Sequence, residues 1–245
     1  MDDLLTFLAF PLNVFLAVLW ATYWRWLWKT RPDGAVVRFL LSPAATVSSL
    51  VLLLAACLWI GFSGNRDFTG TSVFAAVLLY IQTVLFLVTL RGWRRPDGVI
   101  RWRFLLLHAG LLIAAAAGFW GAPDKAEYRV VLADGGVTET AFRPDGSSTA
   151  LGYMLELKGH HAEMSAEGIP SHYEASVSFD GGEAVSVTVN HPYQVRFGED
   201  IYLSEVKEEY CVLQIVRDPW RHVTLAGIVM LLAGAFLLFI KGPRK

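Results

Sequence analysis

The sequence predicts an integral membrane protein: about five transmembrane α-helices plus an extracytoplasmic, antiparallel β-rich domain of sandwich-like fold. Of its 245 residues, 54% are hydrophobic. The apolar excess is concentrated in residues 1–120 and 223–240, in blocks too long and too apolar for ordinary core helices. The residues between these blocks alternate polar and apolar side chains in short runs, which favours strands. We therefore expect a four-helix transmembrane region at 1–120, a β domain at 121–222, and a C-terminal helix with its tail at 223–245.

Each predicted span is about 17–22 residues long, which is enough to cross roughly 30 Å of hydrocarbon. The first span contains Pro11, and a proline inside a membrane helix is tolerated and usually kinks it. Because the segment Met1–Asp3 lacks the basic residues of a signal peptide, we expect the first span to remain as an anchor. The predicted spans are Leu5–Trp26, Ser42–Phe62, Ser72–Leu90, Phe104–Trp120 and Val223–Ile240.

Basic residues cluster in three segments that lie on one side of the membrane if there are five spans. They are Arg25, Lys29, Arg31 and Arg38 after the first span, Arg91, Arg94, Arg95, Arg101 and Arg103 after the third, and Lys241, Arg244 and Lys245 in the tail. The positive-inside rule assigns that side to the cytoplasm. We therefore expect a multi-pass protein of the inner (cytoplasmic) membrane, with the N-terminus and residues 121–222 outside and the C-terminus in the cytoplasm. Tryptophans in the first two basic segments are expected to anchor the cytoplasmic interface.

The β domain is predicted from short alternating runs that are separated by Gly/Asp turns. The predicted strands are Tyr128–Leu132, Val137–Phe142, Tyr153–Lys158, Tyr173–Phe179, Ala184–Asn190, Ile201–Val206 and Tyr210–Val216. The turn signals include Asp134-Gly135-Gly136 and Asp180-Gly181-Gly182. This pattern is typical of an antiparallel sheet or a small sandwich.

Several classes of function find no support in the sequence. The basic residues form no concentrated face outside the expected cytoplasmic loops, so we expect no nucleic-acid partner. Cys57 and Cys211 fall in different regions and are not expected to pair, and there is no C-x-x-C motif. Hydrolase, Walker and dinucleotide-binding motifs are missing, as is zinc-type spacing. We therefore expect no resident metal and no catalytic residue.

His108 is the sharpest candidate for chemistry. It falls early in the fourth span, where an ionisable side chain costs free energy unless it has a partner, so an intramembrane histidine suggests a functional site. Imidazole is a common axial ligand of haem iron. Gly110 and the small residues 114–117 could admit a flat ligand or a neighbouring helix. A histidine that only bonds to another helix remains the alternative.

The other histidines are weaker candidates. His222 follows Trp220 and Arg221 at the outer end of the last span, where it could be a haem ligand or part of an interface anchor. His191 ends a strand before Pro192 and reads as a turn residue, although it too is a possible haem ligand. The pair His160-His161 would point to opposite faces of a strand, which makes a poor metal site.

The C-terminal third of the chain resembles the ResB/CcsB family of cytochrome c biogenesis proteins. The segments that carry the resemblance are Tyr173–Phe179, the V-T-V-N-H-P run Val187–Pro192, Gly198–Tyr202 and Val216–Pro219, which leads into the last span through Leu225–Gly227. The basic loop before His108, with the small residues after it, is similar to the family's histidine-bearing helix. The chain departs from the family in its short outer domain and in having five expected spans where the family usually has four.

This resemblance implies a membrane subunit that helps to move haem b outward and to present it for attachment to apocytochrome c. It implies that His108 ligates haem within the membrane, and that a CcsA/ResC-like membrane protein supplies a second ligand. Attachment would need that partner, so we assign no enzymatic activity to this chain alone. Two alternatives remain: a non-haem membrane scaffold whose outer domain binds a protein, and a b-type electron-transfer subunit.

Overall fold

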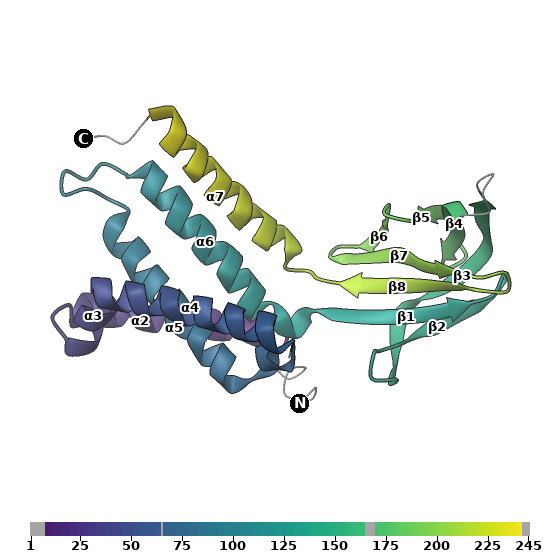
Figure 1. Cartoon of the computed structure of the whole chain (residues 1–245), viewed down its shortest axis with the longest axis horizontal. Coiled ribbons are helices and arrows are strands. Elements are labelled where there is room, and N and C mark those ends of the chain that lie inside the picture. The colour runs from purple at the N-terminus through teal and green to yellow at the C-terminus, as the bar shows by residue number, and fades with distance from the viewer. Residues whose placement is uncertain (1–7, 65, 165–169, 242–245) are drawn as a thin grey trace. The chain divides into compact units, whose positions relative to one another are not determined.

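The computed structural model describes residues 8–64, 66–164 and 170–241. The chain divides into two compact units (Figure 1). One consists of Met1–Pro123 together with Trp220–Lys245 and is helical. The other, Asp124–Pro219, is a β domain.

The helical unit contains four helices that are long and apolar enough to cross a membrane, counted over the described residues. They are α4 (Pro43–Ser63), α5 (Ser72–Gly92), α6 (Trp102–Trp120) and α7 (Arg221–Lys241), and they match the last four predicted spans. The shorter elements are α3 (Ala35–Leu40) and the 3-10 turns η1 (Arg66–Gly70) and η2 (Ala122–Asp124).

The first predicted span corresponds in part to α2 (Leu12–Thr30). Residues 5–7 of that prediction lie outside the described residues. The helix begins directly after Pro11 and runs four residues beyond the expected end at Trp26. Its later half carries Arg25 and Lys29, which lower its hydropathy, and it is not among the four helices suited to crossing a membrane. A fifth span therefore stays a prediction.

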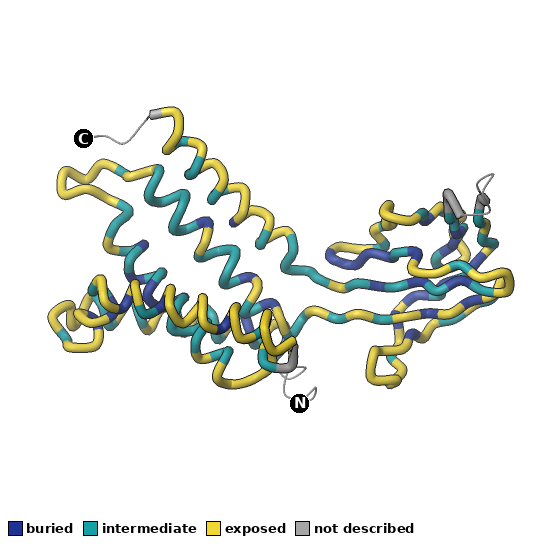
Figure 2. The backbone as a smooth tube through the Cα atoms, in the orientation of Figure 1, coloured by how far each residue is buried: buried dark blue, intermediate teal, exposed yellow. Residues whose placement is uncertain are grey.

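The outer faces of the apolar helices carry large exposed side chains. Phe62 on α4 is 88% exposed and Phe239 on α7 is 87% exposed. Figure 2 shows exposed positions along the length of both helices. In water such continuous apolar surface would be costly, whereas a bilayer solvates it, so these faces fit contact with lipid.

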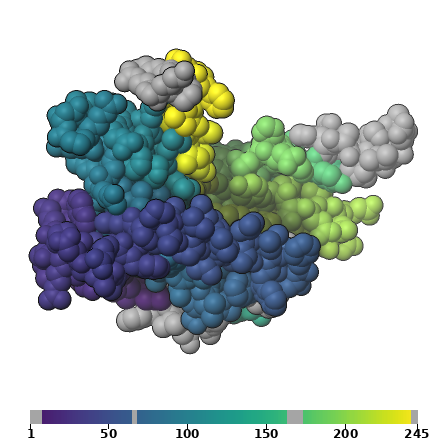
Figure 3. Space-filling view, turned by 60° about the vertical axis from the view of Figure 1, so that its left-hand side comes forward, coloured from purple at the N-terminus to yellow at the C-terminus, as the bar shows by residue number. Residues whose placement is uncertain are grey.

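Specific polar contacts join the described helices. The Ser48 hydroxyl on α4 lies 2.7 Å from the Tyr80 hydroxyl on α5, and the Asn13 amide on α2 donates to the Trp120 carbonyl oxygen at 2.8 Å. Hydrogen bonds between helices are one of the forces that hold membrane helices together. Side chains of α2 to α4, drawn purple to blue, form a continuous surface on one face of this unit (Figure 3).

The described residues of the β domain form one antiparallel sheet of eight strands in the order β5-β4-β3-β2-β1-β8-β7-β6. The strands are β1 (Ala126–Leu132), β2 (Val137–Phe142), β3 (Ser148–Met164), β4 (Pro170–Phe179), β5 (Val185–Thr188), β6 (Tyr193–Arg196), β7 (Glu199–Val206) and β8 (Cys211–Arg217). The predicted antiparallel β domain is confirmed. The largest differences are that β6 has no counterpart among the predicted strands and that β3 is much longer than Tyr153–Lys158.

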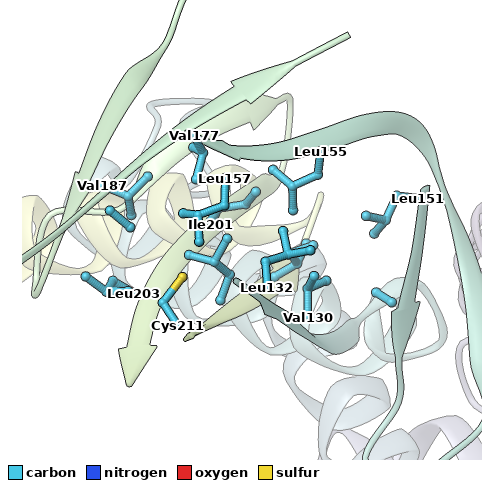
Figure 4. Close-up of a cluster of buried hydrophobic side chains, with 14 of the residues drawn as sticks. Val130, Leu132, Leu151, Leu155, Leu157, Val177, Val187, Ile201, Leu203 and Cys211 are labelled. Atoms are coloured by element: carbon cyan, nitrogen blue, oxygen red, sulfur yellow. The ribbon is translucent and has the colours of Figure 1, made fainter. Parts of the chain in front are cut away.

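The sheet curls over itself, so strands that are not neighbours in the strand order come into contact. Strand β7 lies against β3, β4 and β5 as well as pairing with its neighbours β6 and β8. The enclosed core contains fully buried aliphatic side chains such as Leu155, Val177 and Ile201 (Figure 4). Shifts of register within β3 and β7 bend these strands, as bulges do.

The V-N-H-P segment joins the two end strands of the sheet. Strand β5 stops at Thr188, Asn190 adopts a positive φ of 65°, and the His191 amide donates to the Thr188 carbonyl at 3.1 Å. Pro192, which has no N–H for a ladder, then precedes β6. The segment is a tight turn that brings the two short edge strands close to each other.

Candidate functional site

The site forms around an ordered hairpin between α5 and α6. The Arg95 amide donates to the Val99 carbonyl at 2.9 Å, and the Arg101 amide donates to the Trp93 carbonyl at 2.8 Å. Gly98 closes the turn with a φ of 83°, a value that glycine adopts without strain. The basic loop of the sequence is therefore a defined structure rather than a loose connection.

His108 lies two turns into α6, beside this hairpin. Its Nδ1 is 3.0 Å from the Phe104 carbonyl oxygen, and its ring stacks on the Phe104 ring with centroids 3.8 Å apart. A carbonyl oxygen can only accept, so Nδ1 carries the proton in this contact. In the tautomer with its proton on Nδ1, Nε2 carries the lone pair, which is the arrangement of most metal-ligating histidines.

A cleft of about 560 Å³ opens beside His108. Its wall combines the hairpin, the first two turns of α6 and the C-terminal part of α7. The lining residues are Arg95, Val99, Ile100, Arg101, Trp102, Arg103, Phe104, Leu107, His108, Leu237 and Leu238. The cleft therefore offers one imidazole, two other aromatic rings, several aliphatic side chains and three guanidinium groups.

Close packing of α6 against α7 sets the far wall of the cleft. A Cβ on Gly110 would lie 2.6 Å from the Leu231 backbone nitrogen, and a Cβ on Gly234 would lie 2.9 Å from Leu107. The glycines therefore let the two backbones approach closely. Gly110 thus contacts a neighbouring helix, one of the two roles that its small size suggested.

The structure does not bring His222 to this cleft. His222 is exposed in the first turn of α7, where the Arg221 Nε–H donates to its Nε2 at 3.4 Å. The cleft contacts α7 at Leu237, fifteen residues further along, which corresponds to about 22 Å of helix at 1.5 Å per residue. A ligand held by His108 is beyond the reach of His222 in this chain.

The β-domain histidines whose side chains the structure describes belong to no metal-binding group. His191 is exposed in the V-N-H-P turn. His161 is exposed, whereas its neighbour His160 is 7% exposed, as expected for residues on opposite faces of a strand. The His160 Nε2–H donates to the Lys207 carbonyl at 2.7 Å, and its Nδ1 lies 2.5 Å from Asp134 Oδ1. Within the described residues, no group of three or more His, Cys, Asp or Glu side chains is placed to hold a metal ion.

The two cysteines are free thiols, with Cys57 exposed and Cys211 buried. Burial, together with the nearby Asp134 carboxylate, raises the pKa of Cys211 to about 11. At neutral pH this thiol therefore stays protonated and is a poor nucleophile.

The arginines that line the cleft were not recognised as site residues from the sequence. In the sequence, the only role suggested for these residues (Arg95, Arg101 and Arg103) was to mark the cytoplasmic side of the membrane. The available signal was local: a turn-forming P-D-G within the basic loop at residues 96–98, followed by aromatic residues and a histidine one helical turn further on. Their convergence on one cleft depends on α7, which follows more than a hundred residues later.

Comparison with known proteins supports the resemblance seen in the sequence. The model of the ResB-like family matches residues 98–209, a little under half of the chain. A solved structure titled "Cytochrome c Heme Lyase CcmF" has a TM-score of 0.44 and 16% identity, and the alignment covers 79% of this chain and 34% of that one. The chain thus spans about a third of the length of that protein. A search of curated proteins found no match. The predicted resemblance to the ResB family is confirmed over residues that include His108 and most of the β domain.

Proposed function

We propose that this chain is a membrane subunit of a ResB/CcsB-type cytochrome c maturation system. In this role it helps to move haem across the membrane and presents it for attachment to apocytochrome c. The observation that carries the proposal is His108, whose Nδ1–H is held by the Phe104 carbonyl while Nε2 stays available beside a cleft.

The residues of the cleft fit a haem. A histidine whose other ring nitrogen is bonded to a backbone carbonyl is suited to ligate iron through Nε2. Trp102 and Phe104 offer flat apolar surfaces, and Leu237 and Leu238 supply aliphatic contacts from the opposite helix. The cleft volume of about 560 Å³ falls within the usual range for small-molecule sites.

Haem is the cargo in this proposal, and its vinyl groups and the thiols of the apocytochrome supply the chemistry of attachment. The side chains of this chain bind and orient. His108 would bind the iron, Phe104 keeps the His108 ring in place by stacking, and the close packing of α6 against α7 supports the cleft wall. We assign no catalytic step to this chain alone.

The proposed topology puts the cleft at the cytoplasmic side of the inner membrane, where haem would enter. The arginines of the hairpin support this orientation through the positive-inside rule. The N-terminus and residues 121–222 would then face outward, with the C-terminus in the cytoplasm. A CcsA/ResC-like membrane protein would supply the second axial ligand and the attachment step, and the β domain would position the apocytochrome or the partner.

The decisive test compares two histidine variants of the full chain, purified together with its CcsA/ResC-like partner. We expect the wild-type complex to show a b-type haem spectrum, and His108→Ala to weaken it strongly. His222→Ala is the matched control, because it removes an identical side chain from the distant end of α7. We expect its spectrum to resemble that of the wild type.

Cytochrome c maturation in cells separates this proposal from a scaffold role. Deletion of the chain should abolish the haem stain of c-type cytochromes, and complementation with His108→Ala should restore it poorly. Normal staining after deletion would favour the non-haem scaffold. Unchanged spectra and staining in the His108→Ala strain would refute the ligand assignment.

A further inference from the structure

Three arginines line the mouth of the His108 cleft. They are Arg95 on the hairpin, Arg101 at its end and Arg103 in the first turn of α6. The residues that line the cleft include no carboxylate side chain. We call these three residues the arginine rim.

The local structure reinforces this positive charge. The cleft surrounds the N-terminus of α6, whose first turn carries no acidic residue and whose N-cap, Arg101, makes no side-chain capping bond. The backbone N–H groups of a first helical turn carry partial positive charge. The side chain of Arg101 also lies over the Phe104 ring at 5.0 Å, which brings the cationic group next to the aromatic wall.

We propose that the arginine rim is a carboxylate subsite for a flat, amphipathic ligand. Guanidinium groups bind carboxylates through paired, charge-assisted hydrogen bonds. The apolar ring system of the ligand lies against Trp102 and Leu237, while its acidic substituents reach the rim. This inference rests on the proposed function, in which the ligand is haem and the acidic groups are its two propionates. The rim then fixes which edge of the macrocycle faces the hairpin.

The test compares hemin with its dimethyl ester, in which both carboxylates are blocked. The full chain, purified in a neutral detergent, is titrated with each ligand and followed by absorbance in the Soret region. We expect the wild type to bind hemin at least about tenfold more tightly than the ester, the effect of losing one good charge-assisted contact. Added salt should reduce this preference, because the rim is partly open to solvent.

Adjacent arginines provide a matched pair of variants. Arg95 lines the cleft, whereas Arg94 stacks over the Trp93 ring at 4.0 Å and is not among the lining residues. We expect Arg95→Gln and Arg103→Gln each to weaken hemin binding about tenfold and to leave ester binding unchanged. Arg94→Gln should change neither affinity. Arg95→Lys should restore part of the preference, since it keeps the charge but not the paired geometry.

Failure of this inference can be distinguished from failure of the ligand assignment. Equal affinities for hemin and the ester in the wild type, or equal losses in Arg94→Gln and Arg95→Gln, would overturn the carboxylate subsite while the His108 spectrum stands. If His108→Ala leaves the spectrum unchanged but the preference for hemin persists, the subsite is supported and the ligand assignment fails. A preference abolished by added phosphatidylglycerol would assign the rim to lipid headgroups and overturn the proposal. Wild-type chain that binds neither ligand would overturn both.

Discussion

Gly110 on α6 and Gly227 on α7 face each other at backbone contact. A Cβ added to Gly110 would lie 2.7 Å from the Gly227 carbonyl oxygen, and a Cβ added to Gly227 would lie 2.7 Å from the Gly110 carbonyl oxygen. Such an approach is available only to glycine, because the obstructing atoms belong to the backbone and cannot rotate away. This contact holds together two helices that are separated by the entire β domain in the sequence.

We therefore expect Gly110→Ala to destabilise the helical unit by about 1–3 kcal/mol, the usual cost of forcing extra atoms into a packed interface. The intrinsic preference of helices for alanine would act in the opposite direction. Gly118→Ala is the matched control, because a Cβ at Gly118 on the same helix meets nothing within 4 Å. Unfolding of the purified protein by titration with a denaturing detergent measures both. Equal stability of the two variants would contradict the role of the Gly110 contact.

The β domain contains a carboxylate that depends on a single arginine. Glu199 is 1% exposed, and its Oε2 accepts from Arg196 Nε at 3.0 Å and from Nη2 at 2.7 Å. Arg196→Ala would leave this buried charge without its cation. We expect this variant to lower the free energy of unfolding by about 2–4 kcal/mol. The cost is less than for a fully buried pair because Arg196 is half exposed. Urea unfolding measures both this variant and its control, Lys158→Ala. The control breaks a surface pair with Glu156 and should leave the unfolding midpoint nearly unchanged.

His160 links three parts of the β domain. Its ring on β3 contacts Asp134 in the turn between β1 and β2, and the Lys207 carbonyl in the turn between β7 and β8. We expect His160→Ala to lower the free energy of unfolding by about 2 kcal/mol, since it leaves both groups without this partner. The neighbouring His161 is exposed, so His161→Ala should have little effect. Hydrogen exchange in the two turns should accelerate in the first variant only.

The raised pKa of Cys211 predicts a loss of stability at high pH. The pKa is about 11 in the folded protein, against an ordinary value of 9.0. The folded state thus holds its thiol proton over a range in which the unfolded state has released it. The stabilisation is fully present below about pH 9 and is lost as the pH rises toward about 11. Compared with Cys211→Ala, the wild type should therefore lose more stability between these values. Parallel pH profiles would contradict this prediction.

The elements that could be predicted from the sequence are those whose hydropathy can be averaged over many residues. Spans such as Ser72–Leu90 accumulate hydropathy over many residues, so small local irregularities do not obscure them. The bounds of the first span were harder to predict, because α2 begins only after Pro11 and because Arg25 and Lys29 lie in the later half of α2. Arg25 and Lys29, which were expected in the loop after the first span, therefore lie inside α2.

Short or curved strands left weaker signals. Strand β6 has only four residues, Tyr193–Arg196, and follows a proline, so its alternation is too brief to detect. Strand β3 begins at Ser148, among small polar residues, and passes through Gly152 with a φ of 77°. Glycine inside a strand weakens the pattern that identifies it.

The chemistry of His108 could be proposed from its place in an apolar run, whereas its cleft could not. The lining joins the hairpin before α6 to Leu237 near the end of α7. Which turn of α7 faces His108 depends on the glycine contacts between the helices, and hydropathy carries no information about that register. A sequence alone therefore reveals such a residue but not the side chains that surround it.

The first and last strands of the β domain pair with each other, so the domain is an insertion between α6 and α7 whose two ends lie side by side. Ala126 at the start of β1 lies opposite Arg217 at the end of β8, so the chain enters and leaves the domain at adjacent points. The helices on either side of the insertion, α6 and α7, are themselves packed together. A β domain of another size could therefore replace this one without altering the packing of α6 against α7. Such modularity lets the two units change in sequence and size independently of each other.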